Sequence, residues 1–344
     1  MGVAITSLLL RKEVEINELV GKAIVVDTPM WLYQFISSIR ARDGALLTDS
    51  KGNITSHLVG LFSRVSRIME KGIKLTFTFD GLVPKLKEKE REKRKELKLE
   101  AEKQYKKALK KKDLEEMKKY AARTSKLTPE MIEEAKKLIK AFGMPVVQAP
   151  SEGEAQAAYM VKKDKAFAIA SQDADSLIFG APKLVRNLSI TGKRKLSNRL
   201  KYETVKPEIV DLSENLNHLN IDQNQLTALA MLIGTDYNPG GIKGIGPKNA
   251  LKLVKKHKTD FNALFNEVKW KDFFDFDWEE VYYLIKKMPT TDNYELRWKD
   301  INFEEIKKLL IVEHDFLEER VNSTLEKLFK EVKTKKQKGL GEFF

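Results

Sequence analysis

Cysteine is absent from the 344-residue sequence, which excludes disulfide bonds and thiolate metal sites and fits a reducing intracellular compartment. Long apolar runs are also missing. None approaches the roughly 20 residues of a membrane-spanning helix, and the run at residues 8–10 is far too short for a secretory signal. Histidine is scarce, and its scattered positions predict structural or exposed roles rather than a histidine base: His57, His218, His257 and His314.

Positive charge is in excess and unevenly placed. The net charge is +13, and residues 85–123 alone hold 17 Lys or Arg and 9 Asp or Glu residues, a net charge of +8. A helix this charged is usually a solvated surface helix stabilised by i,i+4 ion pairs. Large apolar residues are so few here that the segment cannot lie flat on a core along its whole length. We therefore expect it to project from the body, where its charge suits a polyanion.

Seven carboxylates stand at the ends of apolar segments rather than on polar faces. They comprise two acids that close apolar runs, a Glu-Gly-Glu pair, an Asp-Ala-Asp pair and one single acid: Asp27, Asp80, Glu152, Glu154, Asp173, Asp175 and Asp236. The carboxyl ends of parallel strands converge at one edge of a sheet, where open α/β folds bind their ligands. Like charges crowded there force protonation or require a counter-cation. The pattern therefore predicts a divalent metal site.

Some of these acids have a simpler interpretation when taken alone. Ser151 and Glu154 have the spacing of a capping box, and Glu152 could answer a helix dipole. Asp27 and Asp80 could each begin a turn after a strand. The Asp-Ala-Asp pair is not needed to end its strand, because the two residues before it already do so. The seven acids together favour the metal site.

The order of the expected elements predicts an α/β fold. Apolar runs at residues 24–26, 75–79 and 166–170 are typical of buried strands, and helical periodicity marks residues 31–42, 57–71 and 128–142. A helix from residue 151 precedes the third strand, and such a strand-helix-strand unit is parallel and right-handed. We expect a mostly parallel central sheet covered by helices on both faces.

A glycine-rich stretch follows Asp236. Residues 238–248 hold four glycines, and Gly246 followed by Pro247 is a good start for a helix over residues 248–258. Glycines let a backbone approach a phosphate closely, and free N–H groups at a helix start can bind it. Such turns also serve as simple tight connections. After an acid that is a candidate metal ligand, in a basic protein, this one predicts a grip on the backbone of duplex DNA without base reading.

The last residues end a polar segment on two adjacent phenylalanines, Phe343 and Phe344. A chain gains nothing for its own fold by exposing two aromatic rings at a frayed end. The rings could fold back onto the core, but four flanking lysines oppose this, so a docking peptide for a partner is the favoured interpretation.

These features together resemble the flap endonuclease family of structure-specific 5′ nucleases, and most closely its archaeal members. The resemblance runs from residue 1 to residue 344, and its most specific runs are residues 79–81, 149–157, 171–173, 175–177, 187–194 and 234–246. Two departures are Ala174 between the paired aspartates and residues 82–84, where the family often has two prolines.

The resemblance implies a site and its cofactors. The seven carboxylates would bind two Mg²⁺ ions roughly 4 Å apart, with Mn²⁺ as a substitute and possible K⁺ at the glycine-rich turn. Lys87 and Arg94, at the foot of an arch, would face the scissile phosphate, and Tyr33 would stack on the substrate. The implied DNA contacts are Arg40, Gly241, Lys243, Gly244, Gly246 and Lys248, and the implied sliding-clamp contacts are Gln337, Leu340, Phe343 and Phe344.

The resemblance also implies an architecture: a PIN-like nuclease domain over residues 1–330, with a projecting helical arch and a helix-two-turn-helix element. Within it lie an N-terminal nuclease region (1–98), the arch (85–127) and an internal nuclease region (116–258) that includes the DNA-binding element (234–258). A flexible clamp-binding tail would follow (331–344).

The implied activity is cleavage of 5′ flaps, with 5′–3′ exonuclease activity, in Okazaki-fragment maturation and DNA repair. The enzyme would be a monomer, cytoplasmic and nucleoid-associated if archaeal. A related exonuclease or junction resolvase is the nearest alternative. A metal-dependent phosphatase would need no basic arch or clamp peptide. A non-catalytic DNA-binding scaffold would not keep seven carboxylates that repel DNA.

Overall fold

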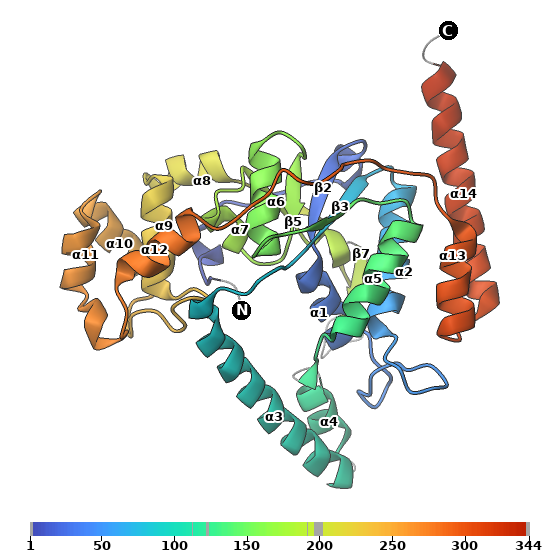
Figure 1. Cartoon of the computed structure of the whole chain (residues 1–344), viewed down its shortest axis with the longest axis horizontal. Helices are drawn as coiled ribbons and strands as arrows, with labels where there is room; N and C mark the ends of the chain where they lie inside the picture. Colours follow the sequence, from blue (N-terminus) through green and yellow to red (C-terminus); the bar gives the residue numbers. More distant parts are fainter. Residues whose placement is uncertain (1–2, 112, 122–123, 191, 196–201, 342–344) are drawn as a thin grey trace.

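A seven-stranded sheet forms the centre of the computed structural model, which describes residues 3–111, 113–121, 124–190, 192–195 and 202–341 (Figure 1). In spatial order the strands are β1 (Lys12–Glu13), β9 (Glu208–Asp211), β6 (Lys183–Arg186), β5 (Ala168–Ala170), β2 (Ala23–Asp27), β3 (Lys74–Phe79) and β4 (Val146–Gln148). The five strands from β6 to β4 are parallel, whereas β9 and β1 are antiparallel additions at one edge. The prediction of a mostly parallel sheet is confirmed.

Successive side chains of each strand point to opposite faces of the sheet. Each face is covered by its own layer of helices. In β2, Ile24 and Val26 pack into one core while Val25 packs into another. The first core is covered by α1 (Thr28–Ser38), α2 (Ser56–Glu70) and α5 (Pro129–Ala141). The opposite face is covered by α6 (Gly153–Lys162). Helices therefore cover both faces of the sheet, as predicted, although α1 begins three residues earlier and ends four residues earlier than the periodicity suggests.

A second group of helices extends the body beyond β6. Its members pack around one large apolar cluster and are α7 (Asp175–Ile178), α8 (Leu212–Leu219), α9 (Gln223–Ile233), α10 (Pro247–His257), α11 (Phe261–Glu267) and α12 (Trp278–Lys286). A separate hairpin joins β7 (Gly192–Lys195) to β8 (Tyr202–Val205). Short single-turn helices lie at Thr6–Leu8, Ile16–Leu19, Leu188–Ile190 and Trp270–Asp272.

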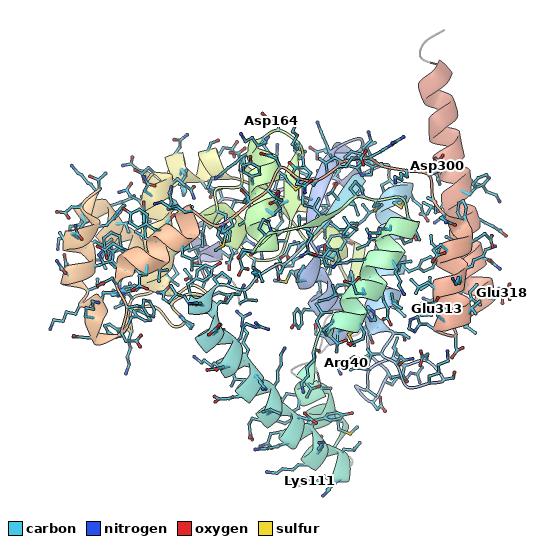
Figure 2. The ribbon with its side chains drawn as sticks, in the orientation of Figure 1. Arg40, Lys111, Asp164, Asp300, Glu313 and Glu318 are labelled. Carbon is cyan, nitrogen blue, oxygen red and sulfur yellow. The ribbon has the colours of Figure 1, made fainter. Side chains whose placement is uncertain are left out.

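The basic segment projects from the body, as its composition predicts. A short turn, η3 (Lys85–Lys87), leads into α3 (Glu88–Lys111), which packs against α4 (Leu114–Ala121). Together they extend away from the sheet (Figure 1). Lys111 marks the far end of α3, whereas Arg40 lies where the projection joins the body (Figure 2). We call η3, α3 and α4 together the arch.

The C-terminal part of the chain returns to the first core. After α12 an extended stretch leads to α13 (Phe303–Lys307), a π-helical turn (Lys308–Glu313) and α14 (Glu318–Gly341). Leu310, Leu325 and Leu328 are buried in the same cluster as the residues of β2 and β3. Residues from the two ends of the sequence therefore share one core.

Helix α14 continues through Gly341, so the tail expected as flexible from residue 331 does not begin at a break in secondary structure. The reason is local, since residues 331–338 include four helix-forming lysines and no glycine or proline. Gln337 and Leu340 lie within the helix, and Phe343 and Phe344 lie outside the described residues. In the part of the chain that the structure covers, no helix has the length and apolar character needed to cross a bilayer.

Helix α5 ends next to Gly143, and the backbone at Lys299 packs directly against this glycine. Gly143 has φ +75°, and a Cβ placed on it would lie 2.2 Å from the Lys299 carbonyl oxygen. The Lys299 N–H donates to the Gly143 carbonyl at 2.8 Å. Both the conformation and the contact exclude a side chain at this position.

We expect Gly143→Ala to be more destabilising than a glycine replacement that imposes only backbone strain. Gly21→Ala is the matched control, because Gly21 has φ +74° with open space around it. The control should lower the free energy of unfolding by about 1–2 kcal/mol. Gly143→Ala should cost about 1–3 kcal/mol more, because the covering backbone must move. Denaturant unfolding of both variants measures this, and equal losses would contradict it.

Candidate active site

The seven acids meet at the carboxyl edge of the sheet, where the sequence places them. Asp27 ends β2, Asp80 follows β3, and Asp173 and Asp175 follow β5. Glu152 and Glu154 stand at the start of α6, and Asp236 lies in the turn after α9. Glu152, Glu154, Asp175 and Asp236 line one pocket together with Lys87 of the arch.

Backbone groups hold two of these carboxylates in place. Asp80 Oδ1 accepts a hydrogen bond from the Gly153 N–H at 2.7 Å, and Asp175 Oδ1 accepts one from the Val3 N–H at 2.6 Å. The first bond places the Asp80 carboxylate at the N-terminus of α6, where the helix dipole favours negative charge. The N-terminal segment thus helps to build the site, which the sequence alone did not indicate.

The capping-box alternative is wrong. Helix α6 has Glu152 at its N-cap, and neither Glu152 nor Ser151 caps it with its side chain; the first N–H of the helix donates to Asp80 instead. The Ser151 hydroxyl instead donates to the Leu82 carbonyl at 2.8 Å, because the chain before α6 packs against the segment after β3. Glu154 therefore has no capping role, and its carboxylate lies among the other acids.

Burial and mutual repulsion disfavour negative charge on these acids. Burial, followed by the neighbouring charge of Asp80, raises the pKa of Asp27 to about 7. Burial, together with Asp173 and Asp236, raises the pKa of Asp175 to about 7. The pKa of Glu154 is raised well above its usual value by burial and then by the charge of Asp27. The edge therefore requires positive charge to keep these carboxylates ionised.

Ser171 is a member of the site that sequence reasoning did not assign. Its hydroxyl lies 3.1 Å from Asp27 Oδ2 and 3.2 Å from Glu154 Oε1, and it accepts the Asp173 N–H at 3.3 Å. A hydroxyl carries one hydrogen and can donate to only one of the two carboxylates at a time. The other must be held by a proton or a cation. The only signal in the sequence is a serine just after a strand and two residues before an aspartate.

The foot of the arch supplies two cations to the edge. Lys87 Nζ lies 2.6 Å from Glu152 Oε2 and 3.3 Å from Asp236 Oδ2, and an Arg94 terminal nitrogen contacts Asp236 Oδ1. Burial alone would lower the pKa of Lys87, but Glu152 and Asp236 outweigh it and raise the pKa. The two residues that the resemblance placed near the scissile phosphate thus lie against the carboxylates.

Tyr33 of α1 lies beneath the arch with its ring partly exposed. Lys98 of α3 places its ammonium 4.9 Å from the ring centroid, a cation–π contact. The stacking of a nucleotide on Tyr33 stays a prediction, and a base that took this ring face would have to displace Lys98.

Arg40 makes its hydrogen bonds within the protein. Its three guanidinium nitrogens donate to the Ser37 and Gly44 carbonyls and to the Ser125 hydroxyl, at 3.3, 2.9 and 2.8 Å. These bonds tie the end of α1 to the segment that returns from the arch. A direct DNA contact by Arg40 stays a prediction.

The glycine-rich turn connects α9 to α10 and carries Asp236 at its start. Thr235 and Asn238 hydrogen-bond across it, and Asn238 Nδ2 donates to the Met231 carbonyl at 2.7 Å. Gly241 is enclosed, since a Cβ there would lie 2.3 Å from the Ile233 backbone. The predicted DNA contacts Lys243, Gly244, Gly246 and Lys248 are exposed, with open space around both glycines. The N-cap residue of α10, Gly246, makes no side-chain cap, so N–H groups at this helix start can donate to an anion.

Two histidines that the sequence shows as scattered meet outside this site. His57 Nε2 lies 3.0 Å from one Glu134 oxygen, and His314 Nε2 lies 3.4 Å from the other. This contact joins α2, α5 and the end of the π-helical turn. The predicted structural role suits both residues.

Comparison with known proteins agrees with this geometry. Two family models match the chain, the XPG N-terminal domain over residues 2–101 and the XPG I-region over residues 143–236. Flap endonuclease 1 of Pyrococcus abyssi is 52% identical over 344 residues, covering 100% of this chain and 98% of the relative. The chain belongs to the flap endonuclease family. Another family relative, flap endonuclease 1 of Thermococcus onnurineus, is 51% identical over 348 residues, covering 100% and 99% of the two chains.

A solved family structure has the same architecture. Flap endonuclease-1 from Methanococcus jannaschii superposes with a TM-score of 0.75 at 41% sequence identity, over 97% of this chain and 100% of that one. The match therefore spans nearly all of this chain and the whole of that one.

The acids fit a divalent metal by their chemistry. Every predicted ligand is a carboxylate, the hard oxygen donor that Mg²⁺ prefers, and the raised pKa values of Asp27 and Asp175 show the need for a cation. No three acidic or histidine side chains in the described ranges are already spaced as ligands of one ion. The Lys87 ammonium lies between Glu152 and Asp236, so a metal bound to both must displace it.

We expect Lys87→Gln to tighten the binding of divalent cations, because it removes a competitor for Glu152 and Asp236. An opposing unit charge at contact distance is worth about 1–4 kcal/mol near a protein surface, so affinity should rise roughly tenfold or more. Titration calorimetry with Ca²⁺ measures this. Lys85→Gln, at an exposed lysine of the same turn, is the control and should change little. Unchanged affinity in Lys87→Gln would show that the ammonium and the metal do not compete.

Proposed function

We propose that this chain is a divalent-metal-dependent, structure-specific 5′ flap endonuclease. The observation that carries the proposal is the acidic edge of the sheet, whose carboxylates are contacted by Lys87 and Arg94 of the arch. The chain is also about half identical to flap endonucleases along its whole length. Seven acids and two arch cations at one edge suit the hydrolysis of a phosphodiester rather than binding alone.

The finer parts of the proposal concern the cofactor and the residues around it. Two Mg²⁺ ions bound by the seven carboxylates, with Mn²⁺ as a substitute, would activate a water and stabilise the leaving oxygen. Lys87 and Arg94 lie where they can move from the carboxylates to the phosphate. There they would stabilise the negative charge that develops during cleavage. Both act by electrostatics and positioning.

The path of the DNA follows from the same geometry. The exposed turn from Lys243 to Lys248, with the N-terminus of α10, would hold a duplex phosphate, and a K⁺ ion could sit on its carbonyl groups. A single-stranded 5′ flap would pass beneath the arch toward Tyr33 and the acids. Duplex grip and arch together favour cleavage at the junction over a phosphatase activity.

We place the enzyme inside the cell, as a monomer in replication and repair of DNA, with 5′–3′ exonuclease activity on nicked duplexes. Cleavage of one labelled set of flap, nicked, single-stranded and four-way substrates tests this assignment. Preferred cleavage of the flap supports it, and preferred cleavage of the four-way junction would favour the resolvase alternative.

Replacement of one predicted metal ligand should separate catalysis from binding. Asp173→Asn should lower single-turnover flap cleavage by at least roughly 10³-fold, because removing an essential member of a catalytic unit costs this much. Flap affinity in Ca²⁺ should survive, since duplex grip comes from the glycine-rich turn. Asp164→Asn is the matched control, because Asp164 lies at the far end of α6 from the site (Figure 2). Normal turnover by Asp173→Asn would refute the site.

Deletion of residues 337–344 should leave cleavage of free oligonucleotides unchanged and abolish stimulation by a sliding clamp. Leu340 and the two terminal phenylalanines would supply the apolar anchors of a docking peptide. Replacing Lys335 and Lys336 with alanine, which keeps those anchors, is the control. Calorimetry of the truncated chain with the clamp measures the loss, and full affinity would exclude the docking role.

A further inference from the structure

Glu90 is a buried acid on α3, where the other charged residues whose burial the structure describes are half-buried or exposed. It lies in the first turn of α3, and only 9% of it is exposed. It belongs to one row along α3 and the preceding turn, together with Lys87, Arg94 and Lys98, at spacings of three, four and four residues. The three cations of this row contact the body at Glu152, Asp236 and Tyr33. Glu90 is the one acid in the row, and its partner lies within the arch.

That partner is Arg94. The Arg94 Nε donates to Glu90 Oε1 at 2.8 Å, while a terminal nitrogen of the same guanidinium contacts Asp236. The guanidinium is rigid and planar, so a bond at Nε fixes the direction of the two terminal nitrogens. One end of the group is therefore anchored on α3 and the other faces the acidic edge.

This pair differs from the other ion pairs of the arch in its burial. The Glu90 side chain is 11% exposed and that of Arg94 is 35% exposed, whereas in the pair of Glu102 and Lys106 the two side chains are 38% and 69% exposed. Exposed i,i+4 pairs contribute little, because water screens them. Glu90 therefore orients the guanidinium from a position that water screens little.

We propose that Glu90 is a positioning residue for catalysis: it anchors Arg94 through Nε, so that only the terminal nitrogens exchange between Asp236 and the scissile phosphate. The inference rests on the proposed function, because it assumes that Arg94 acts on the phosphate. Glu90 itself touches neither the substrate nor the metal. Without it, the guanidinium keeps its charge but loses the direction in which the charge is presented.

The test compares rate with affinity. Glu90→Ala should lower the single-turnover rate of flap cleavage roughly tenfold or more, as expected when a catalytic cation is misplaced. Its flap affinity in Ca²⁺ should stay the same or rise, because a negative charge near the DNA has been removed. Glu102→Ala, in the exposed pair of the same helix, is the control and should leave both values within twofold. A Glu90→Ala variant with an unchanged rate, or with a loss confined to affinity, overturns the proposal.

A double-mutant cycle assigns the loss to Arg94. Arg94→Ala should lower the rate by roughly 10²-fold, the cost of one electrostatic stabiliser, and Glu90→Ala should add nothing to it. Multiplied losses would mean that Glu90 acts through the arch as a whole, which overturns the proposal. A full rate in Arg94→Ala would instead refute the role of Arg94 in the proposed function.

A second variant distinguishes loss of the Glu90–Arg94 hydrogen bond from misfolding of the arch. Glu90→Gln keeps an oxygen that can accept from Nε, so its rate should lie between those of the native chain and Glu90→Ala. Circular dichroism confirms that the variants keep their helix content. Failure of glutamine to restore any rate overturns the anchoring role.

Discussion

Repulsion among buried carboxylates is the constraint on which the rest of this structure depends. The carboxyl edge of the sheet gathers acids whose pKa values are raised by burial and by one another. Such an edge is stable only with positive charge beside it. Lys87 and Arg94 bring that charge from the arch, and the chemistry of the donors suits metal ions. The arch is therefore part of the charge balance of the site.

The surrounding backbone is correspondingly rigid. Asp236 lies in a turn that Thr235 and Asn238 lock from both sides, and Gly241 packs against the end of α9 where a side chain has no room. Asp80 is held by the first N–H of α6, and Asp175 by the N-terminal segment. Acids that repel each other stay close because each is fixed by its own element. The backbone positions of the acids are thus fixed by hydrogen bonds, whereas Lys87 must leave Glu152 and Asp236 before a metal can bind both.

Much of this could be predicted from the sequence, because it depends on local pattern. Apolar runs that end in acids located β2, β3 and β5 and the order of strand and helix, and the scarcity of apolar residues in the basic segment predicted its projection. The antiparallel strands β9 and β1 were not foreseen, since strands of two to four residues carry too little pattern. Ser171, Glu90 and the partners of Arg40 were missed for another reason: their roles depend on contacts that only the folded chain creates.

The return of the C-terminal segment to the first core has a consequence for how the chain comes to be folded. Leu310, Leu325 and Leu328 complete the cluster that Ile24, Val26 and Phe77 begin. A nascent chain leaves the ribosome from its N-terminus, so the first core stays open until α14 has been made. A chain interrupted before α14 keeps all seven acids and lacks Leu325 and Leu328 of this core. Synthesis of α14, rather than of the acids, therefore closes the first core.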